Sequence, residues 1–141
     1  MEIIQGLLDK GYCRNLPDQH ITDAITFLEA LPWAGLGLDW SAFDHQIVSV
    51  RGVHFEDVLE VLRPFGISTN QQLAWLMPSL RKFVYGDSEV MISEMNAVTS
   101  MEFQRSFLFH LDDNLRPSFD EVWEYDGFDR MVLIKIPESR N

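Results

Sequence analysis

Cysteine and positive charge are both scarce in this sequence of 141 residues. A single cysteine, Cys13, cannot form an internal disulfide, which is typical of proteins from a reducing compartment, so we predict a cytoplasmic location. Lys and Arg together number 11 against 22 Asp and Glu, giving a formal net charge of −11. A chain with this charge repels phosphate, so we exclude nucleic acid and anionic membranes as partners.

Long hydrophobic runs and familiar catalytic motifs are absent as well. No apolar run approaches the ~18 residues that a membrane-spanning helix needs, and the first residues lack the basic segment of a signal peptide. The sequence has no P-loop, no dinucleotide-binding glycine motif, no nucleophile elbow and no paired cysteines. We therefore predict a protein that is not an enzyme, with no catalytic residues, no cofactor and no metal site.

Apolar and aromatic residues are plentiful enough for a true core. Hydrophobic residues make up 46% of the chain, including ten Phe and four Trp, and a chain of this length can fold without disulfides. Helical patterns dominate the first half and strand patterns the second. We predict one α+β domain over residues 1–141, with N-terminal helices packed on one face of an antiparallel sheet that ends in a C-terminal β-hairpin.

The spacing of apolar residues places the elements of this domain. Helices are predicted at 2–12, 17–31, 54–62 and 69–84, the last divided by Pro78. Strands are predicted at 46–51, 90–92 and 103–111. The hairpin joins 121–125 to 130–136 through the turn Asp126-Gly-Phe-Asp129. The arm from Met131 to Ile136 is so apolar that we expect it to be central or covered on both faces.

A loop rich in glycine and aromatic residues lies between the second helix and the first strand. It covers residues 33–45 and carries Trp33, Trp40 and Phe43. The three rings either pack under the loop or are displayed to a ligand or partner, and the sequence leaves both readings open.

The stretch from Asp112 to Asp129 concentrates negative charge, with seven carboxylates against one base, Arg116. One reading is that these are the solvated loops and outer face of a hairpin. The other is a docking patch for a basic protein, in which exposed aromatic anchors are ringed by acids. Its predicted contact residues are Asp112, Asp113, Glu121, Trp123, Glu124, Tyr125, Asp126 and Asp129.

The orientation of the first hairpin arm decides between these readings. Alternate residues of a strand share a face, so Trp123 and Tyr125 are exposed if Val122 faces the core. If Trp123 faces the core instead, the patch loses its anchor. A third reading is a small metal-dependent enzyme that uses His110, Asp112 and Asp113 together with Glu121 or Asp126.

In overall character the chain resembles the small acidic immunity proteins of bacterial polymorphic and contact-dependent toxin systems. The likeness lies in its size, acidity and lack of catalytic motifs, and in the stretch Glu121-Val-Trp-Glu-Tyr-Asp126. It implies an inhibitor that covers the active cleft of a basic, nuclease-type toxin and is steered to it by charge. The alternative is an adaptor, or a phage-type inhibitor, with a partner that is not a toxin.

Overall fold

The computed structural model describes residues 3–50 and 53–137, and it confirms the α+β class. Its main element is a seven-stranded antiparallel sheet in the order β1-β6-β5-β7-β8-β9-β4. The strands of this sheet are β1 (Arg14–Asn15), β4 (Asp44–Ser49), β5 (Gln72–Met77), β6 (Lys82–Asp87), β7 (Ser106–His110), β8 (Glu121–Tyr125) and β9 (Arg130–Lys135). A separate small hairpin pairs β2 (Trp33–Ala34) with β3 (Gly37–Leu38).

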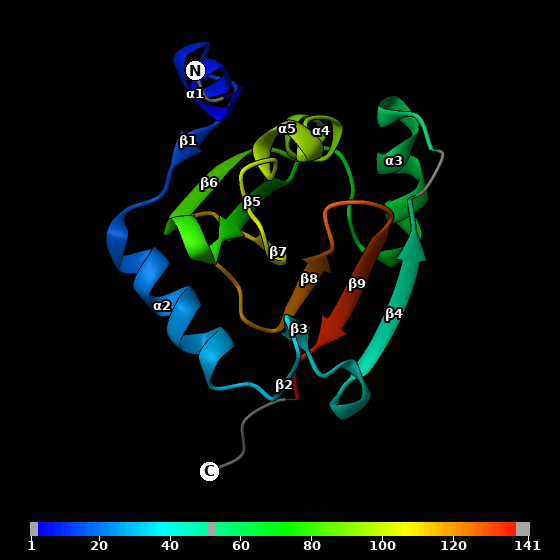
Figure 1. Cartoon of the computed structure of the whole chain (residues 1–141). Coiled ribbons are helices and arrows are strands. Elements are labelled where there is room, and N and C mark those ends of the chain that lie inside the picture. The colour runs from blue at the N-terminus through cyan, green and yellow to red at the C-terminus, as the bar shows by residue number, and fades with distance from the viewer. Residues whose placement is uncertain (1–2, 51–52, 138–141) are drawn as a thin grey trace.

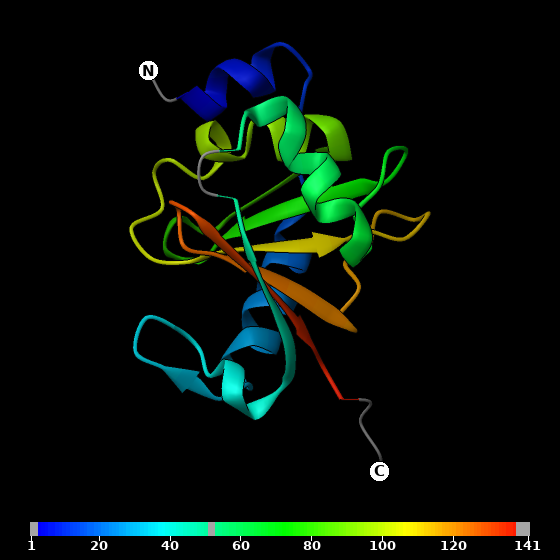
Figure 2. The same cartoon turned by 90° about the vertical axis from the view of Figure 1, so that its right-hand side faces the viewer.

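Helices cover both faces of the sheet, not one face as the sequence predicted. The helices are α1 (Ile3–Asp9), α2 (Asp18–Glu29), α3 (Phe55–Leu62), α4 (Ser88–Ser93) and α5 (Met95–Val98), with 3-10 turns η1 (Trp40–Ala42), η2 (Arg63–Phe65) and η3 (Pro78–Leu80). Figure 2 shows α1, α3, α4 and α5 above the sheet, while α2 and the β2–β3 hairpin lie below it. Figure 1 shows the same arrangement from the side, with α2 at the lower left and β4 at the right-hand edge of the sheet.

Each face of the sheet carries its own hydrophobic core. The upper core buries alternate residues of the central strands, among them Leu73, Trp75, Leu108, Trp123, Tyr125 and Leu133. The lower core buries the residues between them, among them Ala74, Leu76, Phe107, Phe109, Val122 and Val132. Because both faces are covered, the central strands are apolar at nearly every position.

The helix predicted at 69–84 is wrong. This segment forms β5, the turn η3 and β6, with Arg81 in the left-handed conformation at the turn (φ 48°). The apolar run that includes Leu73 and Leu76 satisfies helical spacing, but a strand buried on both faces produces the same pattern. The strand predicted at 90–92 is wrong for a similar reason, since Val90 to Ile92 belong to α4.

The remaining element predictions agree with the structure within a few residues. The helices at 2–12, 17–31 and 54–62 correspond to α1, α2 and α3, and the strand at 103–111 corresponds to β7. The strand at 46–51 corresponds to β4, while Arg51 lies outside the described residues. The C-terminal hairpin is confirmed as β8 and β9, and its second arm is covered on both faces as expected.

Candidate functional site

The predicted aromatic anchors of the docking patch are buried. β8 lies between β7 and β9, with Trp123 and Tyr125 facing the upper core and Glu124 facing the lower layer. Their exposed fractions are 0% for Trp123, 1% for Tyr125 and 2% for Glu124. The prediction that Trp123 and Tyr125 are exposed is therefore wrong, because both faces of the sheet are covered, and these three side chains cannot contact a partner while the fold is intact.

Trp123 and Tyr125 instead fix the upper core. The ring of Trp123 meets that of Phe65 edge-on, with centroids 6.3 Å apart. Tyr125 packs against Trp75 and donates its hydroxyl hydrogen to Oδ1 of Asn96. The pKa of Tyr125 is raised to about 12, mainly by burial and further by the nearby carboxylates of Asp126 and Asp129.

The acidic stretch 112–129 does not form one patch, because β8 divides it. At about 3.3 Å per residue, the five residues of β8 separate its two ends by roughly 13–16 Å. Asp112 and Asp113 lie at the end of the sheet where β7 finishes, whereas Asp126 and Asp129 lie at the opposite end, in the turn to β9. Residues that are close in the sequence therefore belong to two different surfaces.

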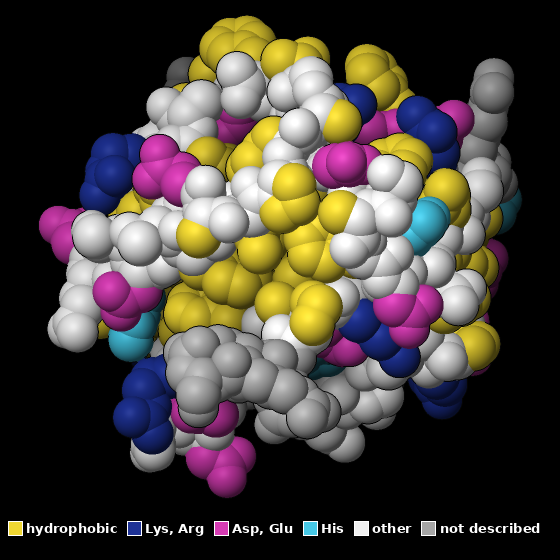
Figure 3. Space-filling model, turned by 90° about the horizontal axis from the view of Figure 1, so that it is seen from below, with side chains coloured by type: hydrophobic (Ala, Val, Ile, Leu, Met, Phe, Trp, Pro, Cys, Tyr) yellow, Lys and Arg dark blue, Asp and Glu magenta, His cyan; other side chains and the backbone are white. Residues whose placement is uncertain are grey.

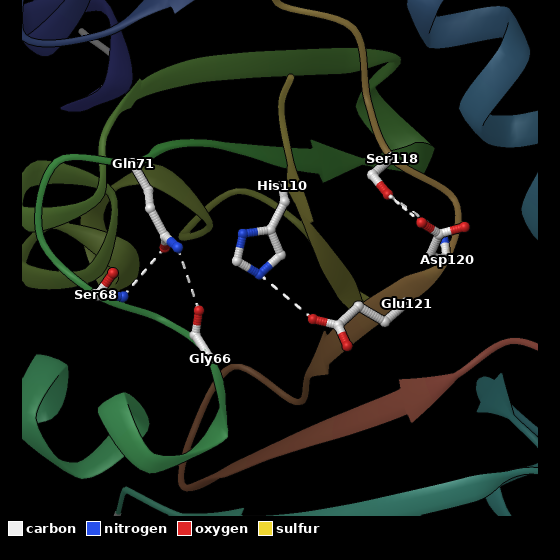
Figure 4. Close-up of polar contacts among 7 residues, drawn as sticks. All are labelled: Gly66, Ser68, Gln71, His110, Ser118, Asp120 and Glu121. Atoms are coloured by element: carbon white, nitrogen blue, oxygen red, sulfur yellow. Dashed lines mark hydrogen bonds and ion pairs between the residues drawn. The ribbon is translucent and has the colours of Figure 1, made fainter. Parts of the chain in front are cut away.

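The first of these surfaces, here called the acidic end, contains Asp112, Asp113, Asp120 and Glu121. Figure 4 shows His110 pointing between the β8 residue Glu121 and the loop that carries Gln71. His110 Nε2 lies 3.5 Å from Glu121 Oε1, while Gln71 accepts the N–H of Ser68 at 3.1 Å. A cavity of about 350 Å³ opens beside them, lined by Asn70, Gln71, Gln72, His110, Leu111, Asp112, Asp113 and Leu115.

Two titratable groups at the acidic end, Asp112 and His110, have shifted pKa values that follow from their surroundings. Asp112 accepts the backbone N–H groups of Arg116 (2.9 Å) and Asn114 (2.8 Å), which lower its pKa despite some desolvation. Burial lowers the pKa of His110, and the attraction of Glu121 opposes this only in part. Across residues 3–50 and 53–137, no three His, Cys, Asp or Glu side chains gather closely enough to hold a metal ion. The ligand set of the metal-dependent alternative is thus not assembled there.

The second surface, here called the aromatic end, carries the exposed side chains Leu36, Met101, Phe103 and Phe128. Ser106 of β7 pairs with Tyr125 of β8, so the segment before β7 and the β8–β9 turn reach the same end of the sheet. Figure 2 shows both on the left, above the β2–β3 turn. Phe103 is 89% exposed and Phe128 84%, whereas Leu36 and Met101 are about half exposed, at 57% and 44%. Figure 3 shows hydrophobic side chains projecting along the upper edge, where these loops lie.

Phe128 is held out by a rigid turn. Oδ1 of Asp126 accepts the N–H groups of Phe128 (2.8 Å), Asp129 (3.0 Å) and Arg130 (3.2 Å). Burial alone would raise the pKa of Asp126, but these three hydrogen bonds outweigh it, and the pKa lies below its ordinary value. Gly127 has a φ of 87°, a conformation that favours glycine.

The loop that carries Phe103 is anchored by Glu102. The carboxylate of Glu102 accepts the hydroxyl of Ser79 at 2.6 Å and its N–H at 3.1 Å. The same carboxylate accepts the N–H of Gln104 at 3.1 Å. The bonds from Ser79 attach Glu102, which precedes Phe103, to η3. The bond from Gln104 fixes the backbone of the residue that follows Phe103.

The loop that carries Leu36 is anchored by the buried Glu124. Its Oε1 accepts the N–H of Leu38 at 2.7 Å, and its Oε2 accepts Nε1–H of Trp40 at 2.8 Å. Burial raises the pKa of Glu124, and the bonds from Leu38 and Trp40 counter this only in part. A cavity of about 350 Å³ lies against this carboxylate, with Leu36, Trp40 and Arg105 among its lining residues.

The sequence left open whether the aromatic residues of the 33–45 loop pack under it or are exposed, and the structure shows both cases. Trp40 and Phe43 are half-buried against the lower core. Trp33 remains 41% exposed, although its Nε1–H is donated to the carbonyl of Leu28 at 2.8 Å and its ring meets Phe107 edge-on. The loop is mainly a packed structure, and its exposed tip is Leu36.

Gly37→Ala is expected to destabilise the protein, because a Cβ at this position would lie 2.7 Å from Oε1 of Glu124. The carboxylate is fixed by two hydrogen bonds, so relieving the clash should cost about 1–3 kcal/mol. Urea unfolding measures this cost. Gly6→Ala is the matched control, since nothing lies within 4 Å of a Cβ there and alanine favours the helix. Equal effects of the two substitutions would contradict the anchoring role of Glu124.

Sequence reasoning missed Phe103 and Phe128 as surface residues. For Phe128 a signal was present, because the second central position of a tight hairpin turn faces solvent whatever the strands pack against. Phe103 gave no such signal, since it was assigned to the start of the strand at 103–111.

Comparison with known proteins gives no relative: no protein-family model matches the chain, and no curated protein matches its sequence. Within the described residues, the structure contains no helix of the length and apolarity needed to cross a bilayer.

Proposed function

We propose that this chain is a non-catalytic, acidic protein-binding inhibitor, and that the aromatic end is its contact surface. The observation that carries this proposal is the pair Phe103 and Phe128, each more than four-fifths exposed on separate loops at the same end of the sheet. Large exposed aromatic side chains at one end of a fold are typical of an interface, where they act as binding hot spots.

The surroundings of the two rings support the same function. Asp39, Glu102 and Asp129 are half-buried in the same loops and supply an acidic rim. Each loop is fixed by a carboxylate that accepts backbone N–H groups, so the contact surface loses little conformational entropy on binding. The net charge of −11 favours a basic partner and accelerates its association at low salt.

The partner we propose is a basic, nuclease-type toxin whose active cleft the chain covers, which would make the chain an immunity protein. A cleft that binds phosphate is positively charged and concave, and it would accept a protruding acidic surface with aromatic tips. An adaptor or phage-type inhibitor with another basic partner would use the same surface and is distinguished by the identity of that partner.

The test begins with capture of the partner on the immobilised chain from lysate of the source cells at low salt, followed by elution with a salt ramp and mass spectrometry. The purified partner is then assayed for nuclease activity with and without the chain. Stoichiometric inhibition supports the immunity function. A basic partner without such activity favours the adaptor, and the absence of any stoichiometric partner contradicts the proposal.

Phe128→Ala should weaken binding of that partner by about 2 kcal/mol, or roughly thirtyfold, because it removes an aromatic anchor from a rigid turn. Surface plasmon resonance measures the loss, which should appear mainly in the dissociation rate. Tyr12→Ala is the matched control, since Tyr12 is an aromatic residue of 52% exposure outside the aromatic end. Equal binding by the two variants would remove the aromatic end from the interface.

A further inference from the structure

The two edges of the sheet differ in length and protection. The β1 edge is only two residues long, whereas the β4 edge runs over six residues, Asp44–Ser49. Proteins commonly protect an edge strand with Lys, Pro, a bulge or a covering element. β4 contains neither Lys nor Pro, and it pairs one to one with β9 without an inserted residue. Figure 2 shows β4 in front of the sheet with no described element over it.

One contact shows which residues of β4 have backbone groups bonded to β9 and which have them pointing outward. The N–H of Val50 donates to the carbonyl of Asp129 at 2.7 Å, and these residues continue the register in which Ser49 pairs with Arg130. In an antiparallel pair, hydrogen-bonded and non-hydrogen-bonded positions alternate. Even-numbered residues of β4 therefore bond to β9, and the backbone groups of Ile47 point away from β9, toward the open edge.

The side chain at the middle of this edge is apolar and exposed. Ile47 is 50% exposed, and its neighbours Gln46 and Val48 are uncharged. The acid in the strand, Asp44, lies at its beginning. An edge with an apolar residue at its centre, outward backbone groups and no nearby charge is complementary to itself.

We propose that β4 pairs antiparallel with β4 of a second copy of this chain, about a two-fold axis at Ile47. Alternate residues of a strand share a face of the sheet. Odd-numbered residues of one copy must therefore pair with odd-numbered residues of the other, so that equivalent side chains lie on the same face of the joined sheet. With Ile47 opposite Ile47, the two residues exchange both N–H···O bonds and their side chains meet on one face. Gln46 then lies opposite Val48, and Asp44 opposite Val50, so no like charges face each other.

This pairing yields a closed dimer and does not depend on the function proposed above. The short β1 edge offers no comparable strand, so the dimer does not extend into a fibre. Strand pairing alone buries less than a standard interface, so the dimer is reversible and forms at high protein concentration. Each copy carries a charge of −11, and added salt therefore strengthens the association by screening the repulsion.

Hydrogen exchange followed by NMR tests the register directly. As protein concentration rises, the amide of Ile47 should become protected, whereas the amides of Gln46 and Val48, already bonded to β9, should not change. Sedimentation equilibrium over the same range should show a dimer that is favoured by salt. A monomer at every concentration, or protection of the even-numbered amides alone, would overturn the proposal.

Ile47→Lys should weaken dimerisation about tenfold or more, because it places two ammonium groups opposite each other on the two-fold axis. Thr26→Lys, on an exposed position of α2, is the control with the same change of charge and should dimerise at least as well as the wild type. Thermal unfolding verifies that both variants fold. Equal weakening by the two substitutions would contradict pairing through β4. Self-association that is weakened by added salt would also contradict the proposal, because screening should favour the pairing of two copies that each carry a charge of −11.

Discussion

Trp123→Ala is expected to lower the free energy of unfolding by about 3–5 kcal/mol, the cost of removing a large aromatic side chain from a core. Trp123 is fully buried at the centre of β8 and meets Phe65 edge-on. Its Nε1 has no hydrogen-bond partner among the described residues. The substitution therefore leaves no acceptor without its donor, and the loss of stability measures packing alone. Urea unfolding followed by far-UV circular dichroism gives this value.

The control for this experiment is Phe128→Ala, which should change stability by no more than about 0.5 kcal/mol, as for an ordinary surface substitution. If Trp123→Ala does not fold, Trp123→Phe keeps a ring against Phe65 and should still show a measurable loss. A Trp123→Ala variant as stable as the wild type would mean that Trp123 is not part of the core.

Glu124→Ala is expected to cost about 2–5 kcal/mol of stability, because it leaves the buried Leu38 N–H and the half-buried Trp40 Nε1–H without their acceptor. The loop that Glu124 anchors should also lose its fixed structure. Trp40 fluorescence should then change, and proteolysis within residues 33–42 should accelerate. An unchanged cleavage rate in that loop would show that Glu124 does not anchor it.

The pH dependence of Glu124 follows from the direction of its pKa. Burial raises the pKa in the folded state above the ordinary 4.5, so the folded state binds the proton more tightly than the unfolded chain does. The proton-linked part of the contribution of Glu124 to stability is therefore complete below about pH 4.5 and is lost as pH rises through the raised pKa. Unfolding of the wild type and of Glu124→Gln at a series of pH values isolates this contribution. The stability of the wild type relative to Glu124→Gln should fall as pH rises; a relative stability that increases with pH would contradict a raised pKa of Glu124.

The C-terminal hairpin could be predicted because its turn and both arms are local signals. Asp126-Gly-Phe-Asp129 is a turn sequence, and the apolar second arm indicated burial on both faces. β5 and β6 could not be predicted in the same way. Their apolar run, with Leu73 and Leu76, fits a buried helix and a doubly covered strand equally well, and only the packing of distant elements decides between them.

The exposure of the aromatic anchors Trp123 and Tyr125 was mispredicted for a related reason. The docking-patch reading requires one exposed face on β8, although the apolar second arm, β9, already indicates that its neighbouring strand is covered. Trp123 pairs directly with Leu133 and Glu124 with Val132, so the burial of β9 implies the burial of β8. That the loops of Phe103 and Phe128 lie at the same end of the sheet depends on the register of β7 with β8 and has no signature within the sequence.

Three carboxylate anchors separate the folding of the loops from the tips of the proposed interface. Glu124, Glu102 and Asp126 each hold the backbone of one loop, whereas Leu36, Phe103 and Phe128 form the tips. A tip residue can therefore be exchanged while its loop keeps its shape, much as an antibody paratope varies on a constant framework. The same fold could acquire a new specificity by substitution of a few tip residues, and libraries randomised at these positions would explore binding without eroding the scaffold.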